Sequence, residues 1–195
     1  MRKFRAVVLC FFVYAGQANA GAYSSKFDGH WWLKLDDLAK TSFINGESDC
    51  YIYEVKGIRY PDDPVESAAK EVDSYYYAHK RHRNKNILKV FREKFKYNPS
   101  HHPLEKYAEN YGERHGGADG DYWWESQGEE RLYFVTGYLA CKETYLGSKI
   151  EQTPEDYVGQ VSNWYHVSGQ NGSGPINEKT RYDKIGNVLD SLLKK

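Results

Sequence analysis

Two stretches of the chain, residues 43–50 (FINGESDC) and residues 134–141 (FVTGYLAC), share the pattern F-x-x-G-x-x-x-C. Each follows a tryptophan pair that an Asp-Gly dipeptide precedes. The first pair is Trp31 and Trp32, and the second is Trp123 and Trp124. Further similar blocks follow in the same order in both halves. The sequence therefore predicts a tandem duplication of one small unit.

Each predicted unit holds three helices. The first has small and apolar residues at spacings of three and four, which form one helical face. The second starts with a proline at the first helical position, Pro64 or Pro154. The third spans residues 84–97 or 181–193. Because long alternating strand patterns are missing from the sequence, we expect an all-α fold, one compact pseudo-two-fold helical domain.

Helix start signals refine these expectations. Residues 126–129 (SQGE) have the spacing of a capping box, in which Ser126 and Glu129 would each satisfy a backbone amide. Asp36 can cap the matching helix of the first unit. The units are predicted to span residues 21–97 and 122–195, with a linker over residues 98–121.

Residues 1–20 have the three parts of a secretory signal peptide. A basic start is followed by the short apolar run 6–14 and by Ala18-Asn19-Ala20, a cleavage site of the A-x-A type. The apolar run is shorter than the roughly 20 residues of a membrane-spanning helix. We therefore expect an exported, periplasmic or secreted protein without a transmembrane segment in its mature part.

The mature chain is close to neutral. The full chain has 27 basic and 27 acidic residues, and the signal peptide contains three of the basic ones, so a net charge of −3 remains. Such a balance provides no general attraction to nucleic acid or to anionic membranes. Nucleic acid is therefore not an expected partner.

Two cysteines remain after the signal peptide, Cys50 and Cys141, at matching positions of the two units. In an exported protein an even pair predicts a disulfide. Two buried free thiols or a shared metal site are the alternatives.

Gly46 and Gly137 also match, each four residues before its cysteine. Glycine inside a helix costs about 1 kcal/mol relative to alanine. Its presence in both units predicts that the two helix backbones approach each other there. Alternatively, Asn45-Gly46 ends the first helix.

The strongest candidate for a binding site is a basic stripe on the third helix of the first unit. Lys85, Lys89, Arg92 and Lys96 fall on one side of that helix, and the second unit lacks such a stripe. The stripe would bind an acidic protein partner, an anionic glycan or a lipid headgroup. Alternatively, it is a solvated face, or it packs against the acidic segment 105–130.

Metal and cofactor sites are not expected. His79 and His82 are three residues apart, but Lys80, Arg81 and Arg83 surround them and would repel a cation. No carboxylate stands at ligand spacing from His79 or His82. His101 and His102 are adjacent to each other. We therefore predict neither a metal nor a cofactor.

Catalysis has little support in the sequence. Glu125, Glu129 and Glu130 are clustered, but capping and a charged helix start explain them. A nucleophile elbow and a phosphate-binding loop are missing. Paired carboxylates have no sequence signature, so a cell-wall or glycan hydrolase remains the alternative. The tryptophan pairs would form core, or would stack on sugars if exposed.

The signal peptide, the Gly and Trp residues before a helix, and the motif Phe134-Val135-Thr136-Gly137-Tyr138 followed by a cysteine resemble small helical exported bacterial proteins. Among named groups the chain is similar to the Rap1a/Tai type, periplasmic immunity proteins that block peptidoglycan-cleaving effectors. The similarity covers about fifteen residues in each unit. It implies a non-enzymatic binding protein that inhibits a cell-wall-degrading enzyme.

Overall fold

A computed structural model describes residues 23–53, 65–94, 118–166 and 176–194. These residues form α-helices and short 3-10 helices, with two isolated β-bridges and no strand. The predicted all-α fold is thus confirmed for this part of the chain. The predicted signal peptide, and the predicted helix start at Asp63-Pro64, lie outside the described residues.

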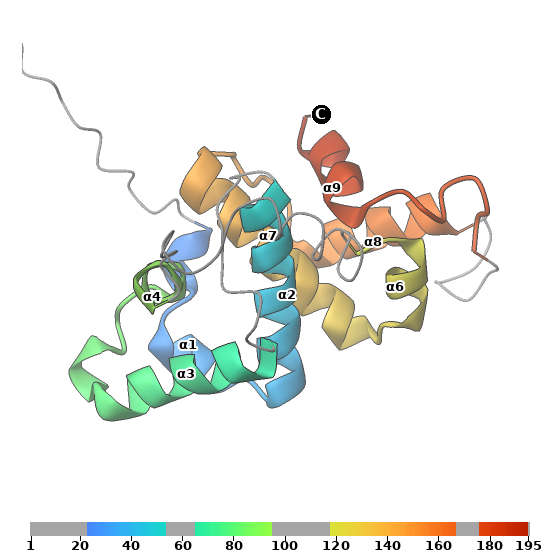
Figure 1. The fold of residues 1–195 in the computed structure, drawn as a ribbon. Coiled ribbons are helices and arrows are strands. Elements are labelled where there is room, and N and C mark those ends of the chain that lie inside the picture. Colours follow the sequence, from blue (N-terminus) through green and yellow to red (C-terminus); the bar gives the residue numbers. More distant parts are fainter. Residues whose placement is uncertain (1–22, 54–64, 95–117, 167–175, 195) are drawn as a thin grey trace, which may run out of the picture.

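Two long helices cross at the centre of the molecule, α2 (Asp37–Tyr53) and α7 (Gly128–Leu146) (Figure 1). A Cβ atom built on Gly46 would lie 1.8 Å from the carbonyl oxygen of Phe134. Reciprocally, a Cβ atom on Gly137 would lie 2.0 Å from the carbonyl oxygen of Phe43. Only glycine fits at either position, because the obstacle is the backbone of the partner helix. α2 continues through Asn45-Gly46, so the alternative that this dipeptide ends the helix is wrong.

One turn beyond the glycines, Cys50 and Cys141 form a disulfide, with their Cα atoms 6.1 Å apart. Both cysteines are fully buried. The disulfide therefore fastens the two central helices on the face where they cross.

The remaining helices flank this crossing on two sides (Figure 1). On one side are elements of the first half: η1 (Ser24–Lys26), α1 (Gly29–Trp32), α3 (Val65–Ala78), η2 (Lys80–His82) and α4 (Ile87–Lys94). On the other side are α6 (Gly120–Glu125), α8 (Pro154–Tyr165) and α9 (Ile185–Leu193). Each side has its own core, and α2 and α7 contribute to both. The first core includes Phe43 and Ala140, and the second includes Cys50 and Phe134.

The two halves repeat the same local contacts at the starts of α1 and α6. The carboxylate of Asp28 caps α1 by accepting from the backbone amides of His30 and Trp31. The carboxylate of Asp119 caps α6 by accepting from the backbone amides of Asp121 and Tyr122. The first helical residue is glycine in both. Its amide donates to a distant carbonyl: Gly29 to Arg83 at 2.7 Å, and Gly120 to Arg181 at 2.8 Å.

The last helix of each half is anchored in the same way. The amide of Ile87 donates to the carbonyl of Phe27, and that of Ile185 donates to Ala118. Two buried tyrosines fix the preceding turns, with hydroxyl groups that donate to backbone carbonyls: Tyr76 to Lys85 at 2.8 Å, and Tyr165 to Asp183 at 2.6 Å. These contacts align Ile87 with Ile185 and Tyr76 with Tyr165.

The two tryptophan pairs do not correspond residue for residue, as the sequence suggests that they should. Counted from the capping aspartates, Trp32 corresponds to Trp123, and both are fully buried. Trp31 therefore corresponds to Tyr122, and Trp124 to Leu33. Trp31 packs against Phe27 and Phe43, whereas Trp124 is 43% exposed. The two segments therefore align by their capping aspartates, and in this alignment the two tryptophan pairs are offset by one residue.

Several helix boundaries also differ from the sequence predictions. Ser126 closes α6 by donating to the carbonyl of Tyr122, and the N-cap of α7 is Gln127, whose amide donates to Glu130. The predicted capping box is therefore shifted by one residue. Thr153 does cap α8, and Asp36 accepts from the amide of Ala39, as predicted.

The units also contain more than three helices. Each half has an additional short helix, α1 or α6, that carries the buried tryptophan. α6 begins at Gly120, inside the segment that the sequence assigns to the linker. The third helices start later than predicted, at Ile87 and Ile185.

Candidate partner-binding surface

The predicted basic stripe lies on and before α4. α4 buries Ile87, Leu88, Val90 and Phe91 against the first core, which leaves Lys89 and Arg92 exposed on the opposite side. Lys85 precedes the helix, because the side chain of Asn86 accepts from the amide of Leu88 at the helix start. Lys96 lies outside the described residues. Of the four residues of the predicted stripe, Lys89 and Arg92 are therefore the ones that the structure places on α4.

Lys85 is engaged within its own segment. Its ammonium pairs with Glu93 and lies 5.6 Å from the ring centroid of Tyr75. Partial burial acts to lower the pKa of Lys85, but the hydrogen bonds to Glu93 and Tyr75 outweigh it and raise that pKa. Lys85 therefore stays charged and holds the turn before α4 in place.

Sequence reasoning missed the aromatic part of this region. The ring of Tyr75 lies beside both Lys85 and Lys94, whose ammonium is 5.7 Å from the ring centroid. The hydroxyl of Tyr75 is 3.0 Å from Nδ1 of His82, and the rings of His82 and His79 stack with centroids 5.3 Å apart. The run Tyr75-Tyr76-Tyr77, which ends just before His79, was the signal in the sequence for this cluster.

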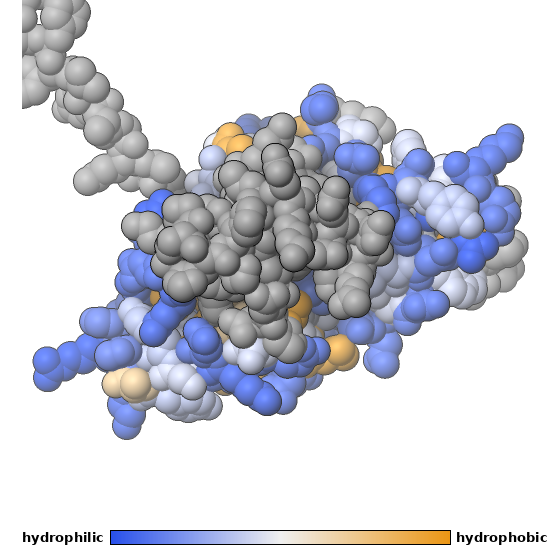
Figure 2. Space-filling view, in the orientation of Figure 1, coloured by the Kyte–Doolittle hydropathy of each residue, from blue (hydrophilic) through white to orange (hydrophobic). Residues whose placement is uncertain are grey.

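We use the name basic surface for the charged side chains of residues 79–94. This segment has one acidic residue, Glu93. Its seven cationic residues are Lys80, Arg81, Arg83, Lys85, Lys89, Arg92 and Lys94. All of them are exposed except Arg83 and Lys85, which are half-buried. Hydrophilic residues lie at the corner of the molecule where α3 meets η2, with a few less hydrophilic residues among them (Figure 2). A protein with a nearly balanced charge thus concentrates positive charge in one segment of the chain.

The matching segment of the other half is different. Residues 177–192 contain three cations and three carboxylates: Lys179, Arg181 and Lys184, with Glu178, Asp183 and Asp190. The segment has no net charge, and two of its cations are also paired with carboxylates: Arg181 with Asp121 and Glu178, and Lys184 with Asp119. The fold therefore does not need a basic surface at this position.

The other candidates from the sequence gain little from the structure. Glu125 and Glu129 are exposed, and Glu130 caps α7, so these carboxylates do not form a buried catalytic pair. Within the described part of the chain, His, Cys, Asp and Glu residues form no group that could hold a metal ion. His101 and His102 lie outside it. Among the described helices, none is long and apolar enough to cross a membrane.

No family model, curated protein or solved structure matches this chain. The resemblance to the Rap1a/Tai type therefore rests on the sequence motif around Phe134 and Gly137 alone. The geometry of the basic surface is the main guide to function.

Proposed function

We propose that this chain is an exported, non-enzymatic binding protein that inhibits a cell-wall-degrading enzyme by docking an acidic face of that enzyme on the basic surface. The observation that carries this proposal is the concentration of exposed positive charge over residues 79–94. Repulsion between neighbouring like charges destabilises a folded protein, and a bound partner of opposite charge reduces this repulsion.

A second part of the proposal concerns origin. The reciprocal glycines, the capping aspartates and the buried tyrosines support a tandem duplication with pseudo-two-fold symmetry. Aligning Ile87 with Ile185 matches Lys89 to Asn187 and Arg92 to Asp190. In this account one copy of the last helix retained a neutral surface, while the other acquired cations for a partner.

The proposal is tested first by capturing partners of the mature chain from periplasmic extract and identifying them by mass spectrometry. We expect a wall-degrading enzyme whose turnover of peptidoglycan falls when the chain is added. Turnover of purified peptidoglycan by the chain alone would favour a hydrolase and overturn the proposal.

Charge reversal then tests the surface itself. We expect the triple variant Arg81→Glu, Lys89→Glu and Arg92→Glu to bind the captured enzyme at least about tenfold more slowly, with a weaker salt dependence, because steering by opposite charges acts mainly on the association rate. Surface plasmon resonance at several salt concentrations measures both effects.

A control with the same change in net charge uses exposed lysines elsewhere: Lys34→Glu, Lys70→Glu and Lys179→Glu. This variant should bind within about twofold of the wild type, since none of its three lysines belongs to the basic surface. If the association rate falls by the same factor in both triple variants, only the net charge matters and the docking surface is elsewhere. If the first triple variant unfolds, these cations are structural.

A further inference from the structure

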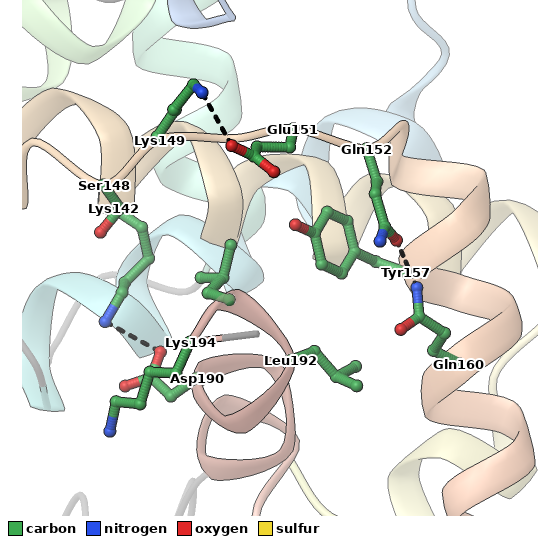
Figure 3. Close-up of a pocket in the computed structure, with 11 residues that line it drawn as sticks. Lys142, Ser148, Lys149, Glu151, Gln152, Tyr157, Gln160, Asp190, Leu192 and Lys194 are labelled. Atoms are coloured by element: carbon green, nitrogen blue, oxygen red, sulfur yellow. Dashed lines mark hydrogen bonds and ion pairs between the residues drawn. The ribbon is translucent and has the colours of Figure 1, made fainter.

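A pocket of about 380 Å³ lies in the second half of the chain (Figure 3). Its walls are the end of α7, the connection that follows it, α8 and the end of α9. Pockets that hold small molecules have volumes of about 300–1,000 Å³. This one is therefore large enough for a compact organic ligand.

The hydroxyl of Tyr157 faces this pocket without a partner. Tyr157 is only 3% exposed, and within the described part of the chain its hydroxyl makes no hydrogen bond. Figure 3 draws this hydroxyl pointing away from α8, into the space between the connection and α9. A polar group buried without a partner costs about 1–3 kcal/mol, and a ligand that bonds to it removes that cost.

Tyr157 can serve such a ligand as a hydrogen-bond donor. Burial, with smaller contributions from Glu151 and Asp156, raises the pKa of Tyr157. Its hydroxyl therefore stays protonated at neutral pH, so that it both donates and accepts hydrogen bonds. It suits a ligand whose own groups also do both, as hydroxyl groups do.

Two glutamines beside Tyr157 provide a further donor and a further acceptor. The amide nitrogen of Gln160 donates to the amide oxygen of Gln152, and Figure 3 draws both side chains next to the ring of Tyr157. Among the described residues, this bond leaves the N–H groups of Gln152 and the amide oxygen of Gln160 without a partner. Hydroxyl groups on neighbouring carbons of a sugar match this pair, because one can accept from Gln152 while the other donates to Gln160.

The charged groups of the lining are paired or directed away from the pocket. Nζ of Lys142 is 2.8 Å from Oδ1 of Asp190, and Nζ of Lys149 is 2.8 Å from Oε1 of Glu151. Figure 3 draws the ammonium groups of Lys149 and Lys194 on opposite sides of the pocket and pointing away from it. The hydrogen-bonding groups that remain for a ligand are therefore uncharged, which favours a neutral molecule over an ion.

Apolar surface completes the lining, since Leu192 and Leu193 of α9 border the same space as the ring of Tyr157. A few placed polar groups beside apolar side chains are typical of small-molecule sites. We propose that this pocket binds a neutral sugar, with hydroxyl groups at Tyr157, Gln152 and Gln160 and a C–H face of the ring against Leu192. This proposal goes beyond the binding of an enzyme and does not rest on it.

The first half lacks the groups that carry this proposal. With Tyr76 aligned to Tyr165, Ala68 of α3 stands in place of Tyr157, and Glu71 stands in place of Gln160. A helix in the matching place thus packs without a tyrosine and a glutamine at these positions. Their presence in α8 is therefore not a requirement of the helical packing.

The test uses the mature chain and a panel of three neutral sugars: methyl glucoside, methyl galactoside and N-acetylglucosamine. Tetrahydropyran, the same six-membered ring without hydroxyl groups, is the matched probe. NMR titration measures binding. We expect at least one sugar to bind with a dissociation constant on the order of 10 mM, and tetrahydropyran to bind at least about fivefold more weakly. Chemical shift changes should centre on Tyr157, Gln152 and Gln160.

Matched variants test the hydroxyl itself. Tyr157→Phe should bind the sugar at least about threefold more weakly, yet it should be as stable as the wild type, because its hydroxyl has no protein partner to lose. Tyr182→Phe changes an exposed tyrosine outside the pocket and should bind the sugar as the wild type does. Gln152→Ala removes an exposed side chain, so it should fold but bind the sugar more weakly.

Four results would each overturn the proposal. They are no binding of any of the three sugars up to about 200 mM, equal binding of tetrahydropyran, full binding by Tyr157→Phe, and a clear loss of stability in that variant. None of these results depends on the enzyme partner, so the two proposals fail separately.

Discussion

Replacing Gly46 with alanine should destabilise the protein by about 3 kcal/mol or more, although alanine is the better helix former by about 1 kcal/mol. The added Cβ would lie 1.8 Å from the carbonyl oxygen of Phe134. That atom belongs to the backbone of α7, so the clash is relieved only if the two central helices move apart. Such a movement would loosen both cores, because both helices contribute to each of them. Gly137→Ala should behave in the same way, through Phe43.

Gly159 provides a matched control for these variants. It lies inside α8, and a Cβ atom built on it would meet no other atom within 4 Å. Gly159→Ala should therefore be neutral or should stabilise the protein by up to about 1 kcal/mol. Urea unfolding of the three variants measures the difference. If Gly46→Ala and Gly159→Ala have the same stability, the helices do not cross as closely as the structure shows.

The central crossing was predictable because its signals are local and repeated. The pattern of a glycine inside each helix and a cysteine one turn later can be recognised from neighbouring residues alone. Thr153-Pro154 predicted the start of α8 for the same reason, since the cap and the proline act on neighbouring amides.

Features that depend on distant segments were not predictable. Helical spacing placed Lys85 in the third helix, but Asn86 starts that helix and the ammonium of Lys85 lies near Tyr75 of α3. The conspicuous tryptophan pairs suggested an alignment one residue away from the one that Asp28 and Asp119 define. The pocket drawn in Figure 3 is lined by side chains from α7, α8 and α9, and no sequence spacing predicts that these helices meet there.

The second large effect concerns the disulfide. Replacing Cys50 and Cys141 together by alanine should lower the free energy of unfolding by about 4 to 5 kcal/mol, because the bond closes a loop with a sequence separation of 91 residues and restricts the unfolded chain. Reduction of the wild type should lower its stability by a similar amount. Urea unfolding with and without dithiothreitol measures both effects, and the alanine variant should not respond to the reductant.

Thiol titration separates the bond from two buried free cysteines. Both residues are fully buried, so native protein would resist a thiol reagent in either case. Unreduced mature protein in strong denaturant is the informative sample: the disulfide predicts no reactive thiol, and free cysteines predict two. Two thiols there would contradict the bond. The bond should also slow the loss of structure in the oxidised protein, because the two central helices cannot separate at Cys50 and Cys141 while it is intact.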